Sequence, residues 1–64
     1  MLFVYSEDDL HSFWMKNTLI PLDLLWFDST FRVVEKSTLY PCLDDICLPY
    51  VPHYNSNYVL DINA

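Results

Sequence analysis

The stretch of residues 13–27 constrains the fold most strongly, because two apolar runs with the two-residue period of β-strands flank a polar corner. The first run is Phe13–Lys16 and the second is Leu22–Phe27. The dipeptide Asn17–Thr18 marks the corner. Pro21 keeps the residue before it extended and removes one backbone donor. This stretch therefore predicts a strand, a corner and a second strand.

Three further segments are typical of strands, namely Met1–Tyr5, Phe31–Lys36 and Tyr58–Ile62. The turn-like cluster Asp28–Thr30 predicts a hairpin between Leu22–Phe27 and the segment after it. Both faces of Leu22–Phe27 are largely apolar, so we expect this strand to be central in a sheet or covered on both sides.

Side-chain alternation predicts which residues of these strands share a face. In the second strand the alternation places Leu22, Leu24 and Trp26 on one face, opposite Asp23, Leu25 and Phe27. In the last strand the predicted inward residues are Tyr58, Leu60 and Ile62, with Asp61 on the other face.

The chain contains no glycine, although tight turns often need a positive φ. We expect the residues that tolerate this region best to take those positions, namely Asp28, Asp44, Asn55 and Asn57. A single helical turn is expected at Ser6–Asp9, with the serine as its N-cap.

The segment Ser37–Asn57 is expected to be a long ordered loop, because its three prolines exclude a regular helix or a central strand. Its predicted apolar anchors are Leu39, Tyr40, Ile46, Leu48, Tyr50 and Tyr54. The fold class is therefore mostly β, as a small antiparallel sheet or partly open barrel. It has one long ordered loop and at most a short helical turn.

Charge and length limit the partners of the chain. Nine acidic and three basic residues give a net charge of −6, which argues against nucleic acid and anionic membrane surfaces. Neither an apolar run of about 20 residues nor a signal-peptide pattern is present, so we expect a soluble chain, of undetermined location. A chain of 64 residues usually needs a disulfide, a metal or a partner for stability.

Cys42 and Cys47 are separated by four intervening residues in a loop bounded by prolines. A structural disulfide between them is the first expectation, with free thiols, metal ligation and a redox pair as alternatives. His53 and His11 are the residues that would complete a zinc site with the two thiols. No metal or other cofactor is expected. The acidic cluster Glu7–Asp9 and the pair Asp44–Asp45 are expected to be solvated, with a weak calcium site as the alternative.

A second candidate site is formed by polar residues at and just after the corner Asn17–Thr18. A cation, an amide, a hydroxyl and a carboxylate could converge on a small polar ligand, beside the faces of two tryptophans. The candidate ligand-binding residues are Trp14, Lys16, Asn17, Thr18, Asp23 and Trp26. The alternative is purely structural, because asparagine and threonine also satisfy the backbone of a tight corner.

The run Phe13–Thr18, followed by Pro21–Asp23, resembles the signature of the domain of unknown function 192 family. Further matches are Met1–Phe3, Arg32–Val34, Pro41–Cys42, Cys47 with Tyr50 and Pro52, and Tyr58–Asp61. The resemblance implies a compact, mostly antiparallel β domain and no established activity. Family domains are longer at both ends, so residues 1–64 resemble a single shortened domain.

These features favour a non-catalytic module that binds a partner protein or a small polar ligand. Exposed strand edges, where the flanking segments of longer family members are lacking, predict a homo-oligomer or another protein partner. The alternative is a thiol- or metal-dependent enzyme built on Cys42, Cys47 and His53. No catalytic residue is predicted for the module.

Overall fold

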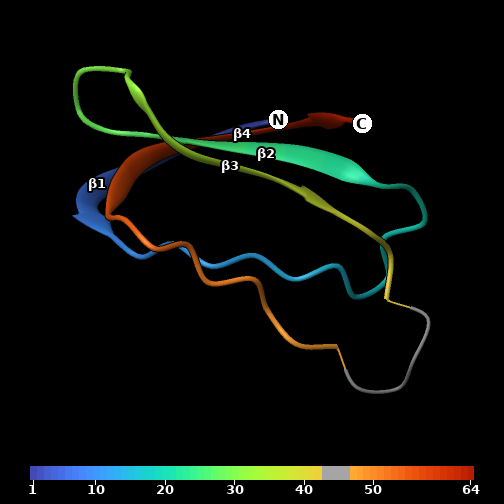
Figure 1. Ribbon diagram of the computed structural model, residues 1–64. Helices are drawn as coiled ribbons and strands as arrows, with labels where there is room; N and C mark the ends of the chain where they lie inside the picture. The colour runs from blue at the N-terminus through green and yellow to red at the C-terminus, as the bar shows by residue number, and fades with distance from the viewer. Residues whose placement is uncertain (43–46) are drawn as a thin grey trace.

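The computed structural model describes residues 1–42 and 47–64, and four antiparallel strands form one open sheet in this part of the chain (Figure 1). The strands are β1 (Leu2–Asp9), β2 (Leu22–Phe27), β3 (Val33–Leu39) and β4 (Ser56–Asn63). Their spatial order is β1-β4-β2-β3. The predicted mostly β fold with an antiparallel sheet is confirmed. None of the described residues forms a helix long and apolar enough to cross a membrane.

The predicted hairpin between β2 and β3 is confirmed, with Asp23 opposite Thr38 and Leu25 opposite Lys36. Strand β2 also pairs with β4 on its other side, so it is central, as expected from its apolar faces. An irregularity in the β2–β3 register falls between Trp26 and Phe27.

Two segments, residues 10–21 and 40–55, run along the same face of the sheet (Figure 1). They meet at one isolated bridge, in which the N–H of Phe13 donates to the carbonyl of Tyr50 at 3.1 Å and the reverse bond is 2.6 Å. The predicted strand over Phe13–Lys16 is therefore wrong. Phe13 packs against the core from beneath the sheet and Met15 is buried, whereas Trp14 is exposed. Apart from the bridge at Phe13, the segment has no neighbouring strand among the described residues to pair with.

The core lies between the sheet and these two segments. Leu24, Trp26 and Val59 are almost completely buried, so the face of β2 that carries Leu24 and Trp26 is the core face. The indole N–H of Trp26 donates to the carbonyl of His11 at 2.9 Å, so the one polar atom of this buried ring is satisfied. The partly buried residues around this cluster are Phe3, Tyr5, Phe13, Leu22, Val34, Leu39 and Tyr50.

The predicted inward face of β4 is wrong, because Val59, and not Tyr58 or Leu60, is fully buried. The register places Val59 opposite Trp26 on β2 and opposite Phe3 on β1. Directly opposite residues of antiparallel strands share a face, so Val59 belongs to the core side. Strand β4 is apolar on both faces, and its sequence alone does not indicate which face is covered.

Several boundaries also differ from the predictions. Residues Ser6–Asp9 continue β1 and do not form a helical turn, because Asp9 pairs with Ser56 across the sheet. Strand β3 begins and ends later than Phe31–Lys36, and β4 is longer than Tyr58–Ile62 at both ends. The predicted loop is correspondingly shorter.

Positive φ occurs at Asn17 and Phe31 among the described residues, and not at Asp28, Asn55 or Asn57. The predictions for Asp44, for the pair Asp44–Asp45 and for Ile46 lie outside the described residues.

Candidate functional site

The two faces of the sheet have different surroundings. Residues 10–21 and 40–55 lie against one face, and no other described segment lies against the opposite face, which we term the open face (Figure 1). Strand pairing places residues on the open face in three rows. The rows are Val4–Tyr58–Phe27–Val33, Leu2–Leu60–Leu25–Lys36 and Ile62–Asp23–Thr38.

The open face is mostly apolar and exposed to solvent. The exposed fractions are 68% for Val4, 52% for Leu2, 50% for Val33 and 47% for Ile62. Contiguous exposed apolar patches on soluble proteins commonly mark interaction sites, whereas scattered apolar residues need no explanation. Two of the rows cross all four strands, and the third crosses β4, β2 and β3, so the apolar residues of the first two rows form a contiguous patch.

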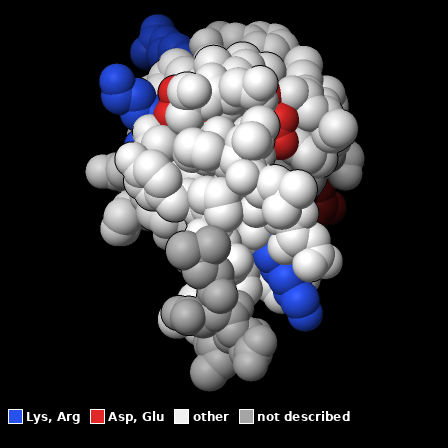
Figure 2. Space-filling model, turned by 90° about the vertical axis from the view of Figure 1, so that its right-hand side faces the viewer, with Lys and Arg blue, Asp and Glu red and all other residues white. Residues whose placement is uncertain are grey.

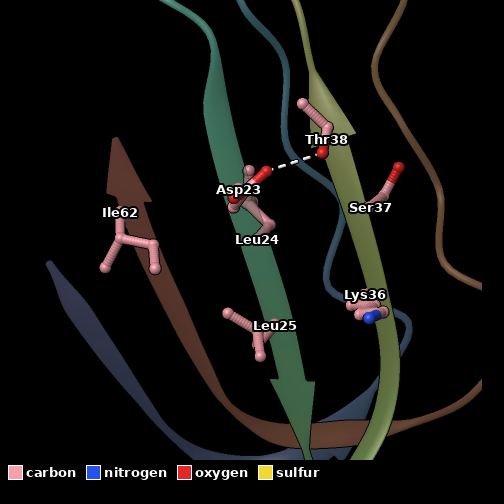
Figure 3. A pocket seen from close by; sticks show the side chains of 7 residues that line it. All are labelled: Asp23, Leu24, Leu25, Lys36, Ser37, Thr38 and Ile62. Carbon is pink, nitrogen blue, oxygen red and sulfur yellow. Dashed lines mark hydrogen bonds between the residues drawn. The ribbon is translucent and has the colours of Figure 1, made fainter. Parts of the chain in front are cut away.

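A hollow of about 430 Å³ lies on the open face, towards the end where β2 begins. Figure 3 shows its lining residues from β2, β3 and β4, which are Asp23, Leu24, Leu25, Lys36, Ser37, Thr38 and Ile62. The hydroxyl of Thr38 donates to the carboxylate of Asp23 at 2.6 Å. The hollow therefore combines an apolar wall with one carboxylate and one ammonium group.

An aromatic side chain projects from the open face at the opposite end of the β2–β3 hairpin. Phe31 has a φ of 62°, an uncommon conformation for a bulky residue. Its ring stacks on Tyr58 with centroids 4.2 Å apart and an interplanar angle of 17°, yet 61% of the residue remains exposed. One side of the Phe31 ring therefore packs on Tyr58, while much of the residue is accessible to a partner.

The carboxylate of Asp28 supports this turn. One oxygen accepts hydrogen bonds from the backbone N–H groups of Arg32 (3.0 Å) and Thr30 (2.9 Å) and from the Thr30 hydroxyl (2.7 Å). These bonds, first that from Arg32 and then that from the Thr30 side chain, lower the pKa of Asp28 below its usual value. The predicted turn cluster Asp28–Thr30 is thus a carboxylate-capped turn.

A polar network on the covered face was not predicted from the sequence. The carboxylate of Glu35 accepts hydrogen bonds from the Tyr50 hydroxyl at 2.5 Å, from the His53 backbone N–H at 2.7 Å and from His53 Nδ1 at 3.3 Å. Desolvation alone would raise the pKa of Glu35, but these hydrogen bonds outweigh it and lower the pKa. The hydrogen bond to Glu35, followed by burial, raises the pKa of Tyr50. This network attaches residues 50–53 to β3. Its only sequence signal is the position of Glu35 within a strand.

Cys42 and Cys47 form a disulfide, with their Cα atoms 5.7 Å apart. The first expectation for this pair is therefore confirmed. The bond engages both sulfur atoms, so neither is a thiolate nucleophile or a metal ligand in this state. His53 contacts Glu35 instead of the cysteines, and the ring of His11 stacks on Tyr5 with centroids 3.6 Å apart.

The predicted ligand-binding residues occupy three different places. Trp14 is exposed, and the Lys16 ammonium lies 5.5 Å from its ring centroid. Asn17 adopts the left-handed conformation of the corner, and the N–H of Thr18 donates to the carbonyl of Met15 at 3.1 Å.

Asp23 and Trp26 do not lie with the other four residues at the corner. Asp23 lines the hollow of the open face, whereas Trp14 lines a different hollow beside Pro49. Trp26 is fully buried in the core. The structure thus brings Trp14 and Lys16 together, and the six-residue ligand site remains a prediction.

Charged side chains are sparse on the surface shown in Figure 2, where most of the area is uncharged and the Lys and Arg side chains lie towards the edges of the view. On the rows of the open face the charged residues are Asp23 and Lys36, whose formal charges cancel. The net charge of −6 therefore comes from elsewhere in the chain.

Comparison with known proteins provides a family and no activity. No curated protein and no solved structure matches the chain significantly. The model of the DUF192 family, described as "Uncharacterized ACR", matches residues 1–64, which is the whole chain. This match confirms the resemblance carried by the motif Phe13–Thr18. The chain therefore belongs to the DUF192 family of uncharacterised proteins.

Proposed function

We propose that this domain is a non-catalytic interaction module that binds a partner protein through its open face. The observation that carries the proposal is the row Val4–Tyr58–Phe27–Val33, which crosses all four strands with aliphatic and aromatic side chains. Val4 and Val33 at its two ends are exposed, and the exposed Phe31 ring stacks on Tyr58. Burial of apolar surface is the main favourable term in protein association. A contiguous patch of this kind favours a protein partner over a soluble small molecule.

A small polar ligand is the second candidate occupant. The hollow on the open face presents the Asp23 carboxylate, the Lys36 ammonium and the Thr38 hydroxyl beside the apolar Leu25 and Ile62. Binding sites for small molecules combine apolar walls with a few placed polar groups in this way. The hollow is shallow and open to solvent, however, so it suits a projecting side chain of a protein partner better.

An enzyme built on Cys42, Cys47 and His53 is the alternative from another functional class. Thiol titration with and without reductant, together with elemental analysis, distinguishes the two. The interaction module predicts no titratable thiol before reduction and no stoichiometric metal. Stoichiometric zinc, or a free thiol with a strongly depressed pKa, would support the enzyme instead.

Position-specific photo-crosslinking tests the interaction module directly. A photo-reactive amino acid at Val4 samples the open face, and the same group at Leu48, which is 81% exposed, samples the covered side. In cells that contain the protein, we expect an adduct from Val4 and none from Leu48. Adducts from both positions, or from neither, would contradict a specific docking face.

A further inference from the structure

We infer that the open face is covered by a second copy of this chain, and that the Phe31 ring of each copy lies in the hollow of the other. The inference rests on the proposed function, because it names the partner of the same face. It follows from the shape, the charge and the area of that face.

The shape of the open face is self-complementary. The face has a projection at one end, the Phe31 ring stacked on Tyr58, and a hollow at the other end, between Ile62 of β4 and Thr38 of β3. A twofold axis parallel to the face and perpendicular to the strands exchanges the two ends and leaves each strand above its own counterpart. This operation places each ring over the hollow of its partner, as an isologous contact requires.

The hollow is large enough for the ring. Its volume is about 430 Å³, whereas a closed apolar cavity of about 150 Å³ accommodates benzene. Leu25 and Ile62 provide apolar contacts at its wall, and the Lys36 ammonium at its rim can face an aromatic ring (Figure 3).

The charge of the face also fits a second copy. Two chains with a net charge of −6 repel one another over most of their surfaces. The three rows of the open face carry one cation, Lys36, and one anion, Asp23, so two such chains can meet over these rows with little charge repulsion. A strongly basic partner would instead be drawn to the acidic surfaces outside this face.

The area of the face limits the size of the interface that two copies can form. Four strands about 4.8 Å apart, with up to eight residues at about 3.3 Å each, span about 19 by 26 Å, or roughly 500 Å² of flat sheet. A standard interface takes about 800 Å² of accessible surface from each partner. A dimer interface of this size therefore needs the whole face.

Sedimentation velocity of the complete chain over a concentration series, from micromolar to millimolar, tests the inference. We expect a monomer–dimer equilibrium that the substitution Phe31→Asn weakens by at least about tenfold. Asparagine tolerates a positive φ better than phenylalanine, so the variant removes the ring without opposing the turn. The matched control Leu48→Asn removes an exposed apolar side chain from the covered side and should leave the equilibrium unchanged.

The substitution Ile62→Thr provides a second test if Phe31→Asn fails to fold. It removes apolar surface from the wall of the hollow and keeps a β-branched residue in the strand, and we expect it to weaken the dimer as well. A chain that stays monomeric throughout the series, or dimers equally weakened by Leu48→Asn and Phe31→Asn, would overturn the inference. A monomeric chain that forms a Val4 adduct with a different protein would overturn the inference and leave the interaction module standing.

Discussion

Glu35 is the residue through which the segment 40–55 is attached to the sheet. Its carboxylate accepts hydrogen bonds from the Tyr50 hydroxyl and from the backbone and ring of His53. Nothing in the neighbouring sequence indicates this role, because the acceptor and its donors are 15 and 18 residues apart. At the scale of single residues, the structure therefore depends on a contact that only the packing of the loop creates.

The pKa of Glu35 predicts how stability changes with pH. Its pKa is lowered in the folded state, so its contribution is present above the ordinary value of 4.5 and is lost as the pH falls through the folded pKa. Tyr50 has a raised pKa, so its contribution is present below 10.0 and is lost as the pH rises through its folded pKa.

The substitution Glu35→Gln should therefore reduce the loss of stability in acid, measured as urea midpoints from pH 7 to about pH 3. Tyr50→Phe keeps the ring, removes one donor and should reduce the same loss partly. If the urea midpoint of Glu35→Gln falls in acid as much as that of the unmodified protein, other carboxylates cause the loss of stability.

Strand β4 illustrates what decides a face at the scale of an element. Its residues are apolar on both sides, and the register with β1 and β2 assigns Val59 to the core and Leu60 to the open face. The alternation of side chains is a local property of a strand, whereas the choice of the covered side depends on where the loops lie.

This assignment predicts that truncating the smaller residue, Val59, lowers the free energy of unfolding more than truncating the larger one, Leu60. Val59→Ala should lower the free energy of unfolding by about 2 kcal/mol, because it removes two methyl groups from a fully buried site. Leu60→Ala removes more atoms from a half-buried site and should cost less, when both are measured by urea unfolding at concentrations where the chain is monomeric. A larger cost for Leu60→Ala would contradict the register.

The disulfide is a second feature that stabilises the fold at the scale of an element, because it closes the short loop between Cys42 and Cys47. In the chain-entropy model, reduction should lower the free energy of unfolding by about 2 kcal/mol, detected as a lower urea midpoint in reductant. The double variant Cys42→Ser/Cys47→Ser should match the reduced protein and show no response to reductant. A reductant effect that persists in this variant would have another origin.

Among the described residues, the molecule is one sheet whose two long connecting segments lie against the same face. The other face is thus available for contact, and the net charge of −6 opposes association. Added salt screens this repulsion. The inferred dimer should accordingly tighten as sodium chloride is raised, which sedimentation velocity at two ionic strengths can measure. Dissociation on added salt would indicate that ion pairs, and not apolar contacts, form the interface.

Sequence alone was sufficient for features that depend on neighbouring residues. The two-residue period of Leu22–Phe27 predicted a central strand with Leu24 and Trp26 on one face, and the cluster Asp28–Thr30 predicted the hairpin. The disulfide was the first expectation from the spacing of two cysteines between prolines. Each of these follows from chain geometry over a few residues.

The tertiary structure alone decided which apolar faces are covered and which polar groups meet. It placed Phe13–Lys16 beneath the sheet, turned Val59 inward, and brought Glu35 to Tyr50. It also left the row around Phe27 open. The physical reason is that burial is a property of the assembled chain: the apolar pattern is the same on both faces of the central strands, and the paths of the two loops determine which face becomes the core.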